Sequence, residues 1–117
     1  MTGNHRILLV EDDVLIGMML ADMFDALDLP EPAQATSNEE ALALIASEPL
    51  GGALVDINLG DEKGWPVADA LAAKNIPFAF TSGGGDVIPP AHAHRKLITK
   101  PFRISDIEAA LEEFGAA

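Results

Sequence analysis

Three acidic residues in a row end the first apolar run of the chain. Glu11, Asp12 and Asp13 close the segment LLVEDD, whose first half has the character of a buried strand. A further acid, Asp56, ends a second apolar run within ALVDIN. Asp is a good helix N-cap, and acids favour the positive end of a helix, which is the interpretation we prefer for Asp13. The other three acids are candidates for chemistry.

Other polar residues follow other apolar runs. In an open parallel sheet the carboxyl ends of the strands meet along one edge, and ligands bind there. We therefore expect the polar residues at these strand ends to border one pocket. They are Glu11, Asp12, Asp56, Thr81, Ser82 and Lys100.

Converging carboxylates need a compensating cation. Like charges a few ångströms apart repel strongly, and without a cation at least one pKa would rise. Hard oxygen ligands with room for water suit Mg²⁺. With Lys100 as a second positive charge and Thr81 as a hydroxyl, Asp56 is placed to receive a phosphoryl group, because each neighbour stabilises charge that moves during transfer.

Composition limits the other possibilities. The 117 residues, 49% hydrophobic, suit one compact domain over 1–117. The chain has no cysteine, which excludes disulfides and thiolate chemistry. A net charge of -12 argues against direct binding to nucleic acid or an anionic membrane. The apolar stretch in MTGNHRILLV is too short for a signal peptide or a membrane span, so we expect a soluble, cytoplasmic protein.

Short, continuously apolar segments indicate strands covered on both faces, as in a parallel sheet. These segments are 7–10, 53–57, 78–81 and, more weakly, 97–99. Segment 32–36 is predicted as a small edge strand, because proline is tolerated as the first residue of a strand.

Apolar residues at helical spacing between these segments predict helices. Two capping boxes, Ser37 with Glu40 and Ser105 with Glu108, mark helix starts, and Pro66 suits a first turn. The alternating order of strands and helices argues for an α/β sandwich with right-handed crossovers.

The stretch SGGGDVIPPAHAHRK interrupts this pattern before the last strand. Its three glycines and two prolines make a full helix unfavourable, so we expect the fourth helix to be short or irregular. His92 and His94 are two residues apart without an evident third ligand, which is more typical of a solvated loop than of a metal site.

The ordered set LLVEDD, LVDINLGDEKG, FAFTSG and ITKPF resembles the receiver domain of two-component response regulators, over essentially the whole chain. The resemblance implies a stand-alone CheY-like domain with the flavodoxin-like fold. This is a three-layer αβα sandwich on a five-stranded parallel sheet of strand order 2-1-3-4-5.

In such a domain Asp56 would be the phospho-acceptor, which receives its phosphoryl group from a histidine kinase or a histidine phosphotransfer protein. By the same resemblance Asp12, Asp56 and the backbone carbonyl of Asn58 would ligate Mg²⁺, with Glu11 acting largely through water.

The resemblance also implies roles for Thr81 as the switch hydroxyl, for the Ser82 backbone amide as a donor to the phosphoryl group, and for Lys100 as the family's lysine. The domain would be a signalling module and not an enzyme in the usual sense, although slow loss of its own phosphoryl group is expected. Its output would be a downstream protein target or onward phosphotransfer.

Two features depart from the usual receiver pattern. Leu97 stands where receivers usually carry Tyr or Phe, so the coupling of a hydroxyl movement to an aromatic rotation is in doubt. FTSGGG partly matches the signature of the stand-alone receivers called the FAT GUY group, but Gly85 replaces the final aromatic residue.

Two other functions use similar features. A small Mg²⁺-dependent phosphohydrolase would also form an aspartyl phosphate on Asp56, but the second acid usual two residues later is replaced by Asn58. A flavodoxin-like flavin carrier would share the layer order. It would need a hydroxyl-rich phosphate loop after the first strand, where this chain has acids.

Overall fold

A parallel sheet of five strands forms the centre of the fold, in the order β2-β1-β3-β6-β7. Counted along the chain within this sheet, the order is 2-1-3-4-5, which confirms the predicted topology. The structure is a computed structural model, and it describes residues 5–115. The strands are β1 Arg6–Val10, β2 Ala33–Ala35, β3 Leu50–Asp56, β6 Phe78–Ser82 and β7 Leu97–Thr99.

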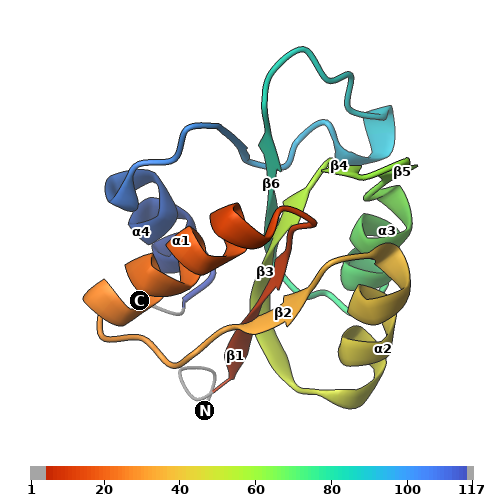
Figure 1. Cartoon of the computed structure of the whole chain (residues 1–117). Coiled ribbons are helices and arrows are strands. Elements are labelled where there is room, and N and C mark those ends of the chain that lie inside the picture. Colours follow the sequence, from red (N-terminus) through yellow and green to blue (C-terminus); the bar gives the residue numbers. More distant parts are fainter. Residues whose placement is uncertain (1–4, 116–117) are drawn as a thin grey trace.

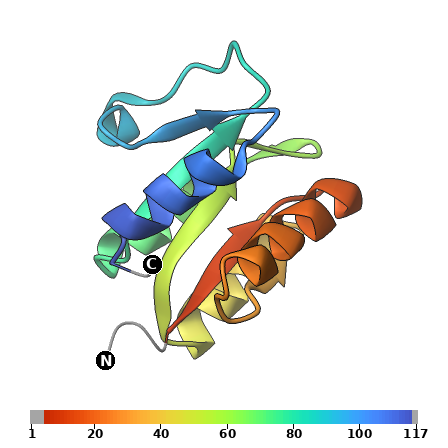
Figure 2. The same cartoon turned by 90° about the vertical axis from the view of Figure 1, so that its left-hand side faces the viewer.

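Helices cover both faces of this sheet, as the continuously apolar strands require (Figure 1). α1 and α4 lie on one face, and α2 and α3 lie on the other (Figure 2). A short antiparallel hairpin of β4 and β5 follows β3. None of the helices within residues 5–115 has the length and apolar character to cross a membrane. The bounds are α1 Val14–Ala26, α2 Asn38–Ser47, α3 Trp65–Ala73, α4 Ile104–Glu113, β4 Asn58–Leu59 and β5 Glu62–Lys63.

Helix starts follow the predicted capping in two of three cases. The Ser37 side chain accepts from the Glu40 backbone N–H at 3.2 Å, although the Glu40 carboxylate accepts from the Thr36 N–H at 2.8 Å and not from the Ser37 N–H. Proline occupies the first turn of α3. The prediction for the last helix is wrong. α4 begins at Ile104, and the Asp106 carboxylate accepts from the Arg103 backbone N–H at 3.2 Å, so this acid and not Ser105 takes part in the cap.

The segment between β6 and β7 contains no α-helix, only a 3₁₀ helix over Pro90–His92, as the glycines and prolines predict. The solvated-loop interpretation is right for the exposed His94 and wrong for His92, which is 4% exposed. The Nε2 atom of His92 lies 2.8 Å from a carboxylate oxygen of Asp69 on α3. Its ring also packs edge-on against Phe80 at 5.9 Å, so His92 fixes this irregular segment onto α3 and the sheet.

Replacing His92 should therefore destabilise the fold. His92→Ala removes buried ring contacts and the hydrogen bond to Asp69, and we expect it to lower the free energy of unfolding by about 2–4 kcal/mol in urea denaturation. His94→Ala, at an exposed position, is the matched control and should change it by less than about 0.5 kcal/mol. Equal effects of the two substitutions would contradict the role of His92 in fixing this segment onto α3 and the sheet.

Candidate functional site

The alternation of side chains along the strands brings four of the six residues expected around the pocket to one face of the sheet. Leu9, Leu54, Ala79 and Ile98 belong to the buried cluster that packs with α1 and α4. Residues two places apart on a strand share a face, so the side chains that continue this alternation at the strand ends lie on the α1 and α4 side. They are Glu11, Asp56, Thr81 and Lys100.

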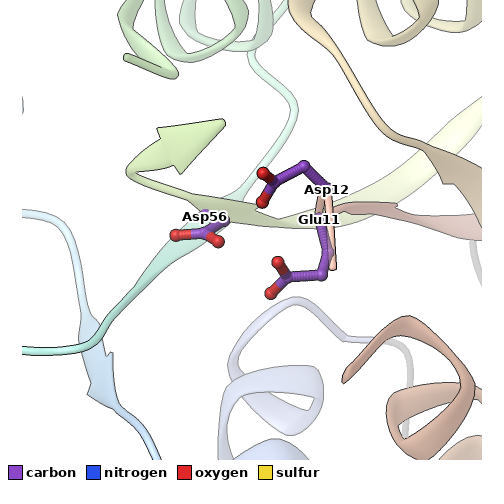
Figure 3. A group of neighbouring side chains, drawn as sticks. All are labelled: Glu11, Asp12 and Asp56. Carbon is purple, nitrogen blue, oxygen red and sulfur yellow. The ribbon is translucent and has the colours of Figure 1, made fainter. Parts of the chain in front are cut away.

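Three carboxylates meet at this edge (Figure 3). Carboxylate oxygens of Glu11, Asp12 and Asp56 all lie within 4.8 Å of one another. Glu11 is 5% exposed and Asp56 is 3% exposed, whereas Asp12 is exposed to solvent. Two buried acids and one open to water therefore share one small volume, where their charges repel unless a cation is near.

Lys100 supplies a positive charge from the chain itself. Its Nζ atom donates to Oδ2 of Asp56 at 2.9 Å and lies 3.1 Å from Oε1 of Glu11. Partial burial alone would lower the pKa of Lys100, but its hydrogen bond to Asp56 and its proximity to the Glu11 carboxylate raise it. The ammonium is therefore held in its charged form between the two buried acids.

Backbone amides engage the remaining carboxylate oxygens. The Asn58 N–H donates to Oδ1 of Asp56 at 3.1 Å, and the Asp13 N–H donates to Oε2 of Glu11 at 3.1 Å. Asp13 itself caps α1, because its side chain accepts from the Leu15 N–H at 2.9 Å, which confirms the preferred interpretation of this third acid. Both oxygens of Asp56 thus have a donor, and its orientation is fixed.

The carboxylates line a cavity of about 370 Å³ that opens to solvent. Asn58, Gly83 and Lys100 are among the other residues that line it. Oε1 of Glu11 is buried and makes no hydrogen bond despite its short distance to Lys100. A buried oxygen that has an ion pair but no hydrogen bond, beside two further carboxylates, is a donor set that fits a hard divalent cation such as Mg²⁺. Within the part of the chain that the structure describes, no other cluster of acids, histidines or cysteines has this metal-binding geometry.

Thr81 and Ser82 lie beside the acceptor strand, but they are not among the residues that line this cavity. Thr81 pairs with Asp56 in the register of β3 and β6, and both hydroxyl residues are buried. The Ser82 hydroxyl donates to the Asp86 carboxylate and accepts from the Gly84 N–H at 2.9 Å. The structure thus places Thr81 next to Asp56 and directs the Ser82 side chain toward the following loop.

The residues missed by sequence analysis are Asp86 and Lys63. Asp86 accepts from the Asn58 side-chain amide at 3.1 Å, and Lys63 donates to the Asn58 side-chain oxygen. Hydrogen bonds from Ser82, and then from Asn58, lower the pKa of Asp86. Asp86 follows the glycine run, but nothing in its local sequence identifies a partner 28 positions earlier.

Comparison with solved structures finds similar domains. SdrG from Sphingomonas melonis Fr1 superposes with a TM-score of 0.84 at 38% sequence identity, covering 97% of this chain and 98% of that chain. The PhyR response regulator REC domain from Erythrobacter litoralis gives a TM-score of 0.75 at 29% identity, covering 94% and 88%. A CheY-like response regulator receiver domain protein from Methanospirillum hungatei JF-1 superposes with a TM-score of 0.81 at 25% sequence identity, covering 93% of this chain and 91% of that chain.

No protein-family model and no curated protein sequence matches the chain. These structural matches agree with the receiver resemblance and with the CheY-like fold. They do not assign the chain to the FAT GUY group, so that part of the resemblance stays a prediction.

The proximity of the buried acids should make the stability of the fold depend on pH through Glu11. Burial, and then the proximity of Asp56, raise the pKa of Glu11 from 4.5 to about 7. An acid whose pKa is higher in the folded state than in the unfolded state destabilises the fold as pH rises between those two values. In EDTA, Glu11→Gln should therefore be more stable than the unsubstituted protein at pH 8 and close to it at pH 5. Thermal unfolding at both pH values measures this difference, and an equal difference at both would contradict the raised pKa.

Proposed function

The chain belongs to the receiver domain family of response regulators, and we propose that it is a phosphorylation-controlled signalling domain with Asp56 as its acceptor. One observation carries the proposal: the buried carboxylate of Asp56 accepts a hydrogen bond from the ammonium of Lys100 and lies within 4.8 Å of two further carboxylates, at the carboxyl edge of the sheet. A buried acid beside a fixed cation and a candidate metal site is suited to receive a phosphoryl group.

The reaction is a transfer between two nucleophiles. The phosphorus–nitrogen bond of a phosphohistidine on a kinase or phosphotransfer protein breaks, and a bond forms between phosphorus and a carboxylate oxygen of Asp56. The Asn58 N–H keeps the carboxylate oriented, while Lys100 neutralises charge on the oxygens during transfer. A magnesium ion held by Asp12, Asp56 and the Asn58 carbonyl, with Glu11 acting through water, would screen the acids and the phosphoryl oxygens.

Thr81 and Ser82 are proposed to bind the phosphoryl group once it is on Asp56. Thr81, paired with Asp56 across β3 and β6, is the proposed switch hydroxyl that donates to the phosphoryl group. The backbone amide of Ser82 is proposed to donate to another phosphoryl oxygen. Leu97 is 43% exposed and offers no ring to rotate, so the change is read out by the loop after β6 and not by an aromatic side chain at this position.

The proposed output is a contact with protein. A net charge of -12 disfavours direct binding to nucleic acid or to an anionic membrane. The phosphorylated domain would bind a downstream protein or pass the phosphoryl group on, in the cytoplasm where histidine kinases present their phosphohistidine. The phosphohydrolase alternative gains no support from the site, because Asn58 holds the Asp56 carboxylate and supplies no second acid.

Substitution of the acceptor tests the proposal. With Mg²⁺ and acetyl phosphate, the unsubstituted protein should gain the mass of one phosphoryl group, which alkaline hydrolysis removes, as expected of an acyl phosphate. Asp56→Asn should gain none, because an amide is not the nucleophile for this transfer. Asp61→Asn changes an exposed acid in the turn between β4 and β5 and should be phosphorylated normally.

Two outcomes would contradict the proposed function. If Asp56→Asn is modified as fully as the unsubstituted protein, Asp56 is not the acceptor. Steady release of phosphate from sugar or nucleotide phosphates would instead indicate the phosphohydrolase.

Metal binding can be tested separately from phosphorylation. Asp12→Ala removes an exposed carboxylate of the acidic cluster and should weaken Mg²⁺ binding roughly 10-fold or more in a calorimetric or NMR titration. Binding to the unsubstituted protein should also weaken as the pH is lowered, because the ligands protonate. Asp22→Ala, which removes an exposed acid of α1, is the control and should leave the affinity unchanged. Affinities of Asp12→Ala equal to those of the control would exclude the proposed ligand.

A further inference from the structure

Asp86 joins three elements around the acceptor and has no role in the function proposed above. Its carboxylate accepts from the Ser82 hydroxyl at the end of β6. Both of its oxygens lie 3.1 Å from the side-chain nitrogen of Asn58, two residues after the acceptor. Lys63 on β5 lies 3.5 Å from the same carboxylate. One side chain therefore ties the loop after β6 to both strands of the β4–β5 hairpin, which follows the acceptor strand β3.

The loop that Asp86 closes has little else to hold it. Residues 83–85 are glycines, and a Cβ atom built on any of them would meet no atom within 4 Å. Gly84 and Gly85 have φ values of 111° and 78°, which residues with side chains rarely adopt. Ordering three glycines is costly in backbone entropy. The anchors of this loop are the Gly84 N–H bond to Ser82 and the contacts of Asp86, which ends the run.

The position of this loop matters to the acceptor. Gly83 lines the same cavity as Asp56 and Lys100, so the path of its backbone sets one wall of the site. Asn58 lines this cavity too, and its backbone N–H donates to Asp56 at 3.1 Å. The loop rises beyond the end of β6, with the β4–β5 hairpin below it (Figure 1). Asp86 links the loop and the hairpin through its contacts with Ser82 and Asn58.

We propose that Asp86 is a positioning residue for phosphoryl transfer to Asp56, which acts by holding Gly83 and Asn58 in place around the acceptor. It does not touch the phosphoryl group. The inference rests on the proposed function, because it assigns a role within that reaction. Lys63 offsets the charge of Asp86, so that the added acid does not increase the repulsion of an incoming phosphoryl donor.

The experiment compares Asp86→Ala, Asp86→Asn and the unsubstituted protein in their rates of phosphorylation by acetyl phosphate at saturating Mg²⁺ and donor. Asp86→Ala should lower the maximal rate roughly 10-fold, because a displacement of about 1 Å around reacting atoms has an effect of this order or larger. Asp86→Asn keeps an acceptor oxygen for Ser82 and should recover part of the rate. Asp61→Ala, which removes a nearby exposed acid outside this network, should keep the full rate.

A second readout separates positioning from a general loss of stability. In amide hydrogen exchange without phosphodonor, Asp86→Ala should increase exchange at Gly84 and at Asn58, while the amides of β1 keep their protection. If Asp86→Ala is phosphorylated at the unsubstituted rate, or if exchange at these two amides is unchanged, the inference is wrong and the proposed function still stands. If the unsubstituted protein gains no phosphoryl group at all, the proposed function fails first.

Discussion

The ion pair between Lys100 and Asp56, with Glu11 as the third member, is the interaction on which this site depends. Two buried carboxylates could not both remain ionised close together without a cation, because each would lose hydration and repel the other. The ammonium of Lys100 lies within 3.1 Å of both. Its position at the end of β7 explains why the last strand must complete the sheet before the site exists.

The rest of the molecule divides into a rigid support and an adjustable rim. The sheet and its four helices bury two apolar clusters, one on each face, and these hold the strand ends at fixed spacing. The rim consists of the loop after β6 and the β4–β5 hairpin, joined by polar contacts of Asp86, Asn58 and Lys63. Phosphorylation would act on the rim, since polar contacts rearrange at less cost than a packed core.

The apolar runs predicted the strands, and the resemblance to receiver domains predicted their order in the sheet. The glycines and prolines between β6 and β7 predicted that this segment forms no full helix, because both residues are local signals. The sequence also predicted that Glu11, Asp12, Asp56 and Lys100 lie at one edge of the sheet. The strand ends are visible in the local sequence, and parallel strands have their carboxyl ends at the same edge. The burial of His92 was not predicted, because its partner Asp69 is 23 positions away. The start of α4 was misplaced because Ser105 and Asp106 are both plausible capping residues, and local sequence does not decide between them.

The most direct test of the central claim is a crystal structure of the protein with Mn²⁺ in place of Mg²⁺, located by its anomalous scattering. One metal peak is expected within about 2–2.5 Å of carboxylate oxygens of Asp12 and Asp56 and of the Asn58 carbonyl. Lys100 should remain within hydrogen-bond distance of Asp56 in the same structure. A metal bound elsewhere, or a Lys100 ammonium directed away from Asp56, would contradict the central claim.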